Sequence, residues 1–325
     1  MTAEAIETHD FPFDPTYGYD LDRLLQVGTP EAPADFGDFW QGAYAKALAV
    51  DTAPRVGALE EERDGVRVHA VSYTSVGGFR VGGWLTLPAD GHVTHGMVVL
   101  HGYGGRDAVD VTLPPPGTAA IWPCARGMAT RSLDPEIPAT AAEHVVHGIG
   151  SRETYVHGGC VADTWCAASA LLALVPGAAR QLALVGGSFG GGIGALALPW
   201  DDRFHHGLLT VPSFGNHPLR LTLPCTGSGE AVRAHYARHP EVTEVLGYFD
   251  AAVAATRIRV PVHVGAALFD PAVPPPGQFA VHNALGGPKE LFVLTAGHVE
   301  YPAAAEEDAR LRAAQREFLA EADPR

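Results

Sequence analysis

The sequence is poor in lysine and contains no long apolar run. Only Lys46 and Lys289 occur in 325 residues, and the 22 basic residues face 37 acidic ones, for a formal net charge of −15. A nucleic-acid-binding protein needs a basic face, and no cluster of Lys or Arg is present, so we exclude that class. The longest apolar runs, such as "MVVL" at 97–100 and "LLALV" at 171–175, are too short to cross a bilayer. We therefore expect neither a nucleic-acid partner nor a membrane partner.

Cysteine is also scarce, and none of the cysteines forms a CxxC pair. The four are Cys124, Cys160, Cys166 and Cys225. The first ten residues, "MTAEAIETHD", have neither a basic flank nor an apolar core, so we expect no secretory signal and a cytoplasmic location. In that compartment the cysteines are expected to be reduced thiols, some of them buried.

The first sixty residues differ in composition from the rest. Residues 11–36, rich in Pro, Gly and aromatic side chains, are typical of an extended arm. Aromatic residues then recur near helical spacing, which predicts an amphipathic helix over 35–50 capped by Asp35. The alternating stretches "VRVHAVSY" (66–73) and "FRVGGWLTLP" (79–88) predict two antiparallel strands.

Beyond residue 96, short apolar runs without alternation each end in Gly, Asp, Ser or His. They are "GMVVLHGYGG", "AAIWPCARG", "QLALVGGSFGG", "GLLTVPSFG", "VPVHVGAALFD" and "ELFVLTAGH". Such runs are typical of strands buried on both faces of a parallel sheet, with helical stretches such as 160–177 and 303–320 between them. We predict an α/β fold over residues 1–325 as one domain: a doubly wound, mostly parallel sheet with antiparallel entry strands and an N-terminal arm plus helix over 1–60. Functional groups of such sheets collect at the carboxyl ends of the strands.

One of these strand ends carries a serine among glycines. Gly186-Gly187-Ser188-Phe189-Gly190 fits the Gly-x-Ser-x-Gly pattern, between a predicted strand and a run that can form a helix. Small flanking residues let the backbone approach closely around a strained turn, and the following helix directs free N–H groups at developing negative charge. The pattern predicts that Ser188 is a nucleophile.

Two phosphate-binding interpretations compete for the same glycines. Residues 190–195 match the dinucleotide pattern G-x-G-x-x-A, but that motif requires an acidic residue roughly 20 positions further on. Asp201 and Asp202 come too early for this role. A P-loop requires Gly-Lys-Ser/Thr, and no lysine is near. We therefore expect no nucleotide and no other cofactor.

A serine nucleophile needs a base and an acid, which in this topology follow it along the chain in the order Asp/Glu, then His. Asp270 closes the run "VPVHVGAALFD", and His298 follows "ELFVLTAG". We predict that these two residues complete a triad with Ser188. Asp250 is the competing acid, but its segment "GYFDAAVAAT" resembles a helix, so we assign it a structural or supporting role.

The oxyanion hole is expected to use two backbone N–H groups. One belongs to Phe189, the residue after the serine, and the second to Tyr103 in "HGYGG" (101–105), which follows an early strand. The same residues are then the nearest substrate-binding groups. His101 lies in this loop and is expected to shape the turn rather than act as the base.

Three histidine pairs have spacings that could suggest a metal site. His235 and His239 are four residues apart, but Tyr236 stands where a zinc protease has glutamate. The other two pairs lack nearby Cys or carboxylate ligands at metal spacing: His144 with His147, and His92 with His95. We expect surface or capping roles for these histidines and no metal.

The sequence resembles the acetyl xylan esterase/cephalosporin C deacetylase family, carbohydrate esterase family 7, over nearly its whole length. The matching segments are "DFGDFW", "GGWLTLP", "HGYGG", "ARG" (125–127), "GGSFGGG", "GYFDAAVAATRIRVPV", "FDPAVPPPGQFAVHNAL" and "GHVE". The family's acid-loop pattern D-x-x-C-P-P-x-x-x-F-A-x-x-N is followed from Asp270 to Asn283 without a gap. The resemblance implies an α/β-hydrolase fold, places Ser188, Asp270 and His298 on the triad, and places Tyr103 and Phe189 on the oxyanion hole.

The chain departs from the family pattern at four positions and in one segment. The positions are Met128 and Phe189, where the family usually has Gln, Val273 in place of Cys, and Val299 in place of Glu. The segment 128–160, which helps form the entrance and oligomer contacts in the family, matches poorly. The family forms ring-like hexamers, so the resemblance also implies a homo-oligomer. The departures are expected to act on specificity, first of all at Phe189.

These observations predict a serine carboxylesterase that hydrolyses acetyl or other short-chain acyl esters of small molecules, such as O-acetylated sugars or cephalosporin-type acetates. The same triad also serves amidases, peptidases and acyltransferases. A catalytically silent binding protein with this fold is the alternative outside enzymes. Faster cleavage of an aminoacyl anilide than of an acetate would favour an amidase, and failure of Ser188 to react with a fluorophosphonate would favour the silent protein.

Overall fold

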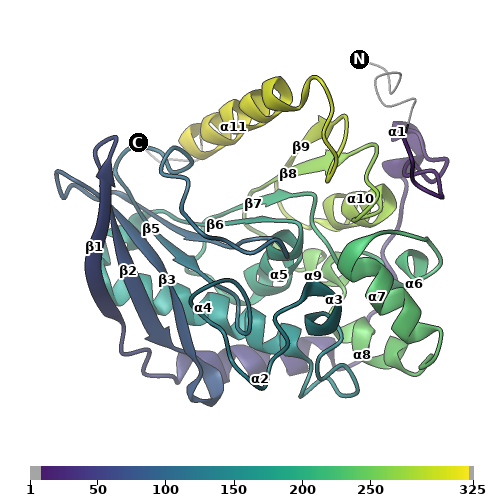
Figure 1. Cartoon of the computed structure of the whole chain (residues 1–325), viewed down its shortest axis with the longest axis horizontal. Coiled ribbons are helices and arrows are strands. Elements are labelled where there is room, and N and C mark those ends of the chain that lie inside the picture. The colour runs from purple at the N-terminus through teal and green to yellow at the C-terminus, as the bar shows by residue number, and fades with distance from the viewer. Residues whose placement is uncertain (1–8, 322–325) are drawn as a thin grey trace.

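A nine-stranded mixed sheet forms the centre of the molecule in the computed structural model, which describes residues 9–321 (Figure 1). The strand order is β1-β2-β3-β5-β4-β6-β7-β8-β9. The first three strands and the β3–β5 pair are antiparallel, and all pairs from β5 to β9 are parallel. The bounds are β1 Arg55–Arg63, β2 Val66–Thr74, β3 Arg80–Pro88, β4 His95–Val99, β5 Thr118–Pro123, β6 Leu182–Gly187, β7 His206–Thr210, β8 Val262–Ala267 and β9 Lys289–Leu294.

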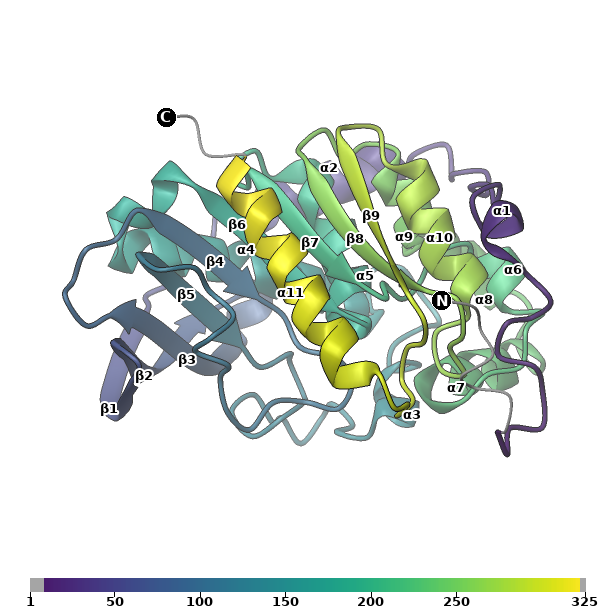
Figure 2. The same ribbon diagram turned by 90° about the horizontal axis from the view of Figure 1, so that it is seen from above.

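Helices cover both faces of this sheet (Figures 1 and 2). Helix α11 crosses one face, whereas α2, α4 and α5 lie against the other. The α-helices are α1 Leu21–Leu24, α2 Phe36–Leu48, α3 Ala141–His144, α4 Val156–Leu174, α5 Phe189–Ala197, α6 His217–Arg220, α7 Gly227–Tyr236, α8 Val242–Tyr248, α9 Ala251–Ala255, α10 Pro275–Ala284 and α11 Ala304–Glu321. Within the described part of the chain, three short 3₁₀ helices are η2 Val76–Gly78, η3 Pro176–Arg180 and η4 Leu198–Trp200. No helix among residues 9–321 is long and apolar enough to cross a membrane.

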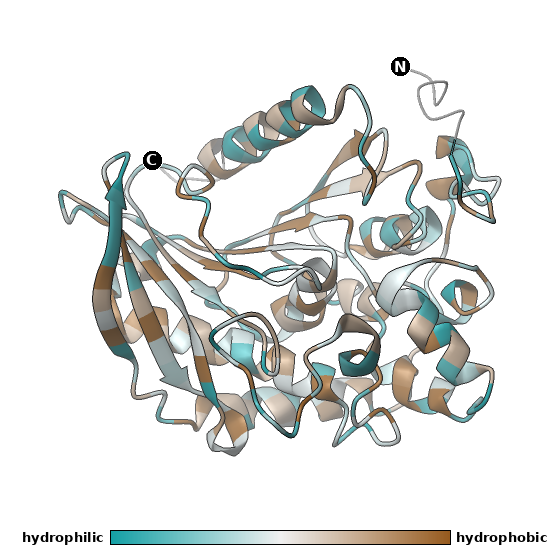
Figure 3. Cartoon of the chain, viewed as in Figure 1, coloured by the Kyte–Doolittle hydropathy of each residue, from teal (hydrophilic) through white to brown (hydrophobic). Residues whose placement is uncertain are grey.

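Burial on both faces explains why the central strands lack alternation. In β4, Val98 belongs to the larger core, beneath the α2–α4–α5 layer, while Met97 and Val99 point to the opposite face. There they join a second cluster with Trp122 of β5 and Phe318 of α11. Apolar side chains therefore occupy successive positions of these strands, and Figure 3 shows hydrophobic colouring along them. The doubly wound sheet predicted from these runs is confirmed.

The antiparallel entry predicted for 66–73 and 79–88 is also confirmed, because β2 pairs with β3 in one continuous register from Val66↔Pro88 to Thr74↔Arg80. Strand β1 was not predicted. All nine of its residues are exposed, and its sequence "RVGALEEER" has neither alternation nor an apolar run. Within the N-terminal arm, residues 1–8 lie outside the described residues, and the rest contains the four-residue helix α1 before α2 begins.

The predicted helix over 35–50 appears as α2 with Asp35 at its N-cap position, but the side-chain hydrogen bond expected of a cap is absent. The side chain of Asp35 accepts no hydrogen bond from the first turn of α2. Instead its carboxylate accepts the hydroxyl hydrogen bond of Tyr248 and a hydrogen bond of 2.7 Å from Arg152. Partners from two distant segments thus hold Asp35 away from the helix end. On the inner side of α2, Trp40 is fully buried and donates its indole N–H to the Tyr248 carbonyl.

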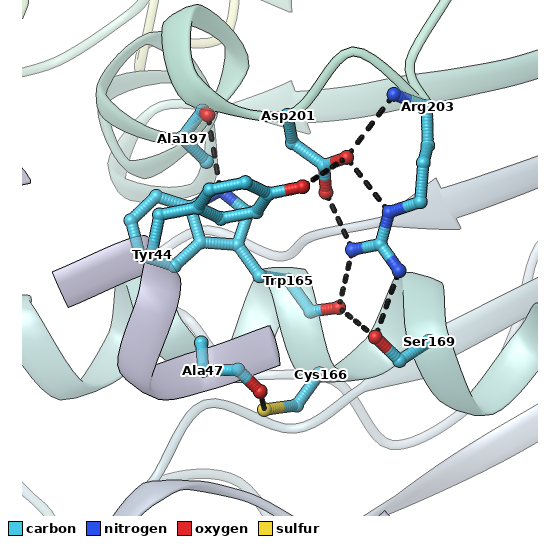
Figure 4. A network of polar contacts seen from close by, with 8 residues as sticks. All are labelled: Tyr44, Ala47, Trp165, Cys166, Ser169, Ala197, Asp201 and Arg203. Atoms are coloured by element: carbon cyan, nitrogen blue, oxygen red, sulfur yellow. Dashed lines mark hydrogen bonds and ion pairs between the residues drawn. The ribbon is translucent and has the colours of Figure 1, made fainter. Parts of the chain in front are cut away.

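A buried carboxylate joins α2 to the far end of α5. Asp201, which follows η4, accepts hydrogen bonds from Arg203 at 2.7 and 2.6 Å and from the Tyr44 hydroxyl of α2 at 3.0 Å (Figure 4). Arg203 also donates to the Ser169 hydroxyl and the Trp165 carbonyl of α4. The network therefore fixes α2 and α4 against the segment that follows α5 and η4, at the end of α5 opposite to Ser188.

We predict that this network contributes strongly to stability. Asp201→Ala leaves the guanidinium of Arg203 without its carboxylate and should lower the free energy of unfolding by about 3 kcal/mol. Tyr44→Phe removes one hydroxyl hydrogen bond to the same carboxylate and should cost only about 1 kcal/mol. Urea denaturation of both variants and the wild type measures the difference. Equal stability of Asp201→Ala and the wild type would contradict the assigned role.

Candidate active site

Ser188 lies at a sharp turn between β6 and α5 and has a positive φ, with φ 55° and ψ −119°. This conformation is strained for a residue with a side chain, so the neighbouring glycines must provide space. A Cβ on Gly186 would lie 2.3 Å from the Gly190 carbonyl oxygen, and one on Gly190 would lie 2.8 Å from the His101 carbonyl oxygen. Gly186 and Gly190 are therefore required by close backbone approach rather than by flexibility.

The structure brings Ser188, His298 and Asp270 into one hydrogen-bonded chain. Ser188 Oγ lies 2.9 Å from His298 Nε2, and His298 Nδ1 lies 2.8 Å from Asp270 Oδ2. Each residue follows the carboxyl end of a different parallel strand, namely β6, β9 and β8. Because a carboxylate only accepts, His298 Nδ1 carries the proton, and Nε2 accepts from the Ser188 hydroxyl. This is the arrangement that activates a serine hydroxyl for attack.

Asp270 is completely buried and is held by more than the histidine. Its Oδ1 accepts the N–H groups of Ala272 and Val273, both at 2.9 Å. Its Oδ2 accepts the side-chain amide of Gln278, also at 2.9 Å. Gln278 itself is fully buried and lies on α10. Sequence reasoning missed Gln278, because nothing in "PPGQFA" marks it as the residue that turns back to the acid.

The glycine before His298 gives the carboxylate room. A Cβ on Gly297 would lie 2.3 Å from Asp270 Oδ2, closer than real contacts allow. His298 itself has a positive φ of 54°, so the turn that presents its ring is strained like that of Ser188. Both Ser188 and His298 are therefore held in unusual backbone conformations.

Two opposing effects act on the pKa of His298. Burial disfavours the charged imidazolium, but the hydrogen bond to Asp270 and its negative charge outweigh that effect and raise the pKa above 6.5. His298 therefore holds a proton more readily than a free histidine. A base tuned in this direction suits proton transfer near neutral pH.

The two expected oxyanion donors lie beside Ser188. Phe189 is the first residue of α5, where a helix leaves its N–H groups without intrahelical partners. The loop of Tyr103 is close, because a Cβ on Gly102 would lie 3.5 Å from Ser188 Cβ. Within the described residues the Tyr103 N–H donates to no backbone carbonyl. The rings of Tyr103 and Phe189 are also in contact, with centroids 4.3 Å apart.

His101 and Asp250, the other residues considered for the site, both form hydrogen bonds from their side chains to backbone groups. His101 is buried, with Nδ1 2.7 Å from the Gly102 carbonyl, while its Nε2 accepts the N–H of Ala125 at 2.9 Å. Asp250 precedes α9 rather than lying within it. It accepts four backbone N–H groups, and burial raises its pKa to about 6. These contacts agree with the structural roles expected for both residues.

The expectation of a surface or capping role is wrong for His144. Its side chain is completely buried, with both ring nitrogens in hydrogen bonds. The reason is tertiary: the segment carrying α3 folds over the Tyr103 loop, which local spacing does not reveal. His235 and His239 stack on each other with centroids 4.7 Å apart. Among residues 9–321, no three His, Cys, Asp or Glu side chains are grouped so that they could hold a metal ion.

Comparison with known proteins identifies the family. The profile described as acetyl xylan esterase (AXE1) matches residues 19–316. The chain belongs to the acetyl xylan esterase family. It is accordingly a hydrolase that acts on esters, a serine carboxylesterase for acetyl esters. The resemblance inferred from the sequence motifs is therefore confirmed.

Solved structures show the same fold. An acetyl xylan esterase from Paenibacillus sp. R4 is 24% identical, with a TM-score of 0.79 over 91% of this chain and 99% of that one. Acetyl xylan esterase 1 from Thermoanaerobacterium sp. JW/SL YS485 is 18% identical, with a TM-score of 0.80 over 96% of this chain and 100% of that one. An acylaminoacyl peptidase from Pyrococcus horikoshii is 16% identical, with a TM-score of 0.58 over 80% of this chain but only 41% of that one.

The effect of Asp270 on His298 can be measured directly. In ¹⁵N-histidine-labelled protein, we expect the pKa of His298 to lie above 6.5, and to fall in Asp270→Asn because the charge that raises it is gone. An NMR titration, with the His298 signal identified from a His298→Gln variant, gives both values. An unchanged or higher pKa in Asp270→Asn would contradict the geometry.

Proposed function

We propose that Ser188, His298 and Asp270 hydrolyse short-chain acyl esters through a covalent acyl-enzyme. Ser188 Oγ attacks the ester carbonyl while His298 Nε2 takes the hydroxyl proton. His298 then donates that proton to the departing alkoxide, which leaves as the alcohol. Water attacks the acyl-enzyme, gives one proton to His298, and the proton returns to Ser188 Oγ as the carboxylic acid departs.

Asp270 and two backbone groups support these steps. Asp270 accepts the hydrogen bond of the His298 Nδ1–H group, keeps Nε2 free to accept, and stabilises the imidazolium. The N–H groups of Phe189 and Tyr103 donate to the oxyanion of the tetrahedral intermediate. One such donor is typically worth ~10²–10³ in turnover. The observation that carries the proposal is the unbroken hydrogen-bond chain from Ser188 to a buried carboxylate.

The substrates we propose are acetyl esters of small molecules, such as O-acetylated sugars or cephalosporin-type acetates. Two of the similar solved structures are named as acetyl xylan esterases, which supports the acetyl group and a carbohydrate alcohol. The net charge of −15 disfavours polyanionic substrates. Family membership also supports a homo-oligomeric assembly, which we propose as a hexamer acting in the cytoplasm.

Removal of the nucleophile tests the mechanism. Ser188→Ala should lower kcat for an aryl acetate by roughly 10³-fold or more, since the remaining groups cannot form the acyl-enzyme. The wild type should also react with a fluorophosphonate at Ser188, whereas the variant should not. Equal rates of acetate release from the two proteins would refute the proposal. Faster cleavage of an aminoacyl anilide than of the acetate would point to an amidase.

An acyl-length series tests the substrate proposal. The rings of Phe189 and Tyr103 pack together beside Ser188, and Phe214 lies against Phe189 with centroids 6.1 Å apart. We expect these rings to leave little space for a long acyl chain, so that kcat/KM falls roughly tenfold or more from 4-nitrophenyl acetate to the octanoate. Comparable values for both esters would rule out the short-chain preference.

A further inference from the structure

Two buried histidines lie on either side of the Tyr103 hydroxyl. His157 Nε2 is 2.9 Å from Tyr103 Oη, and His144 Nδ1 is 3.2 Å from the same oxygen. His144 ends α3 and His157 is the second residue of α4, so both lie within the segment 128–160 that departs from the family pattern. Neither histidine belongs to the Ser188 chain.

Both imidazoles are neutral at pH 7. Burial lowers the pKa of His144 to about 4, although its hydrogen bond to the Arg126 carbonyl acts in the opposite direction. Burial also holds the pKa of His157 well below its ordinary value. A neutral imidazole donates from one nitrogen and accepts at the other. The direction of every hydrogen bond around Tyr103 then follows once the donor and acceptor of one of these bonds are known.

The fixed end is a carbonyl group. His144 Nε2 lies 2.9 Å from the Arg126 carbonyl oxygen, which can only accept, so Nε2 carries the proton of His144. His144 Nδ1 is then an acceptor, and Tyr103 must donate its single hydroxyl proton to it. The contact with His157 is satisfied only when His157 Nε2 donates to Tyr103 Oη. The protons are therefore ordered from His157 through Tyr103 to His144.

The ends of this chain are tied to rigid parts of the fold. Arg126 is held by a bidentate ion pair with Asp163 of α4, at 2.6 and 2.9 Å. The ring of His157 packs against Tyr155 and Phe214, with centroids 4.3 and 4.6 Å apart. His144 is thus held through Arg126 and its ion pair, and His157 is held by aromatic packing, independently of their contacts with Tyr103.

We propose that His157 and His144 are positioning residues for the oxyanion hole. They hold the ring of Tyr103 by its hydroxyl against the ring of Phe189, and thereby fix the loop whose backbone N–H faces the oxyanion. The inference rests on the proposed function of Tyr103 and Phe189. The proposal gives segment 128–160 and Phe189 a joint role. Phe189 provides a ring against which Tyr103 packs, and His144 and His157 of segment 128–160 hold the Tyr103 hydroxyl in an ordered set of hydrogen bonds.

Tyr103→Phe tests the proposal, because it keeps the ring and the backbone N–H but removes the hydroxyl. An oxyanion contact exists only in the transition state, so kcat should fall roughly tenfold while KM for an aryl acetate stays within about twofold. Tyr44→Phe is the matched control: the same hydroxyl loss in the distant Asp201 network should leave kcat unchanged. Unchanged kcat in a folded Tyr103→Phe protein would overturn the proposal.

A rescue pair tests the hydrogen bond from His157. Gln can place an N–H near the position of Nε2, whereas Leu cannot donate. His157→Gln should therefore retain a kcat several-fold above that of His157→Leu, and the KM values of both should stay near that of the wild type. If kcat falls equally in the two variants, and circular dichroism shows that both are folded, then His157 contributes only packing and the proposed hydrogen bond is contradicted.

The wild-type protein gives a test that needs no variant to fold. Long-range ¹H–¹⁵N NMR of labelled histidines at pH 7 should show His144 and His157 as neutral Nε2–H tautomers. A Nδ1–H tautomer or a charged ring at either position would overturn the assignment. Failure of this proposal is distinct from failure of the proposed function: in the first case Ser188→Ala still abolishes ester hydrolysis, and in the second it does not.

Discussion

The strained backbone of Ser188 is the constraint on which the site depends. A positive φ in a residue with a side chain costs of order 1–3 kcal/mol, and it persists only where its surroundings determine it. Here the Ser188 N–H donates to the Thr210 carbonyl and the Ser188 carbonyl accepts from the Ser213 N–H, so β7 and its loop hold the turn on both sides. Glycines at 186 and 190 remove the Cβ atoms that would prevent the approach. The turn raises the hydroxyl to the edge of the sheet, within 2.9 Å of His298.

The parallel strands then bring the other groups to the same edge. Strands β6, β8 and β9 run parallel and end at the same edge of the sheet, with β7 between β6 and β8, and the loops after them carry Ser188, Asp270 and His298. The loop after β4 carries Tyr103 to the first of these. Behind them lies a layer of buried polar contacts that fixes orientation, with Gln278 on the carboxylate and His157 on the Tyr103 hydroxyl. The hydrogen-bonded chain of Ser188, His298 and Asp270 therefore has only three members. Buried residues such as Gln278 and His157 fix the orientation of the groups around it.

The sequence predicted a doubly wound, mostly parallel sheet with antiparallel entry strands, and the family, because buried parallel strands leave unbroken apolar runs that end in small or reactive residues. It also predicted which strand ends carry Ser188, Asp270 and His298. It did not predict β1, whose exposed residues show no pattern, or the true partners of Asp35. The roles of Gln278 and His144 were missed for one physical reason. Their partners, Asp270 for Gln278 and Tyr103 for His144, come close only in the folded chain, so residue spacing in the sequence does not reveal the contacts.

The central claim is that Ser188 carries the acyl group during turnover. Rapid acid quenching of the enzyme with an aryl acetate, followed by peptide mass spectrometry, tests it most directly, because it shows which side chain is acylated. The account predicts an acetyl group on the peptide containing Ser188, and no such adduct in the Ser188→Ala variant. An acetyl group that accumulates during turnover on another residue, or hydrolysis that proceeds in the Ser188→Ala variant at the wild-type rate, would contradict it.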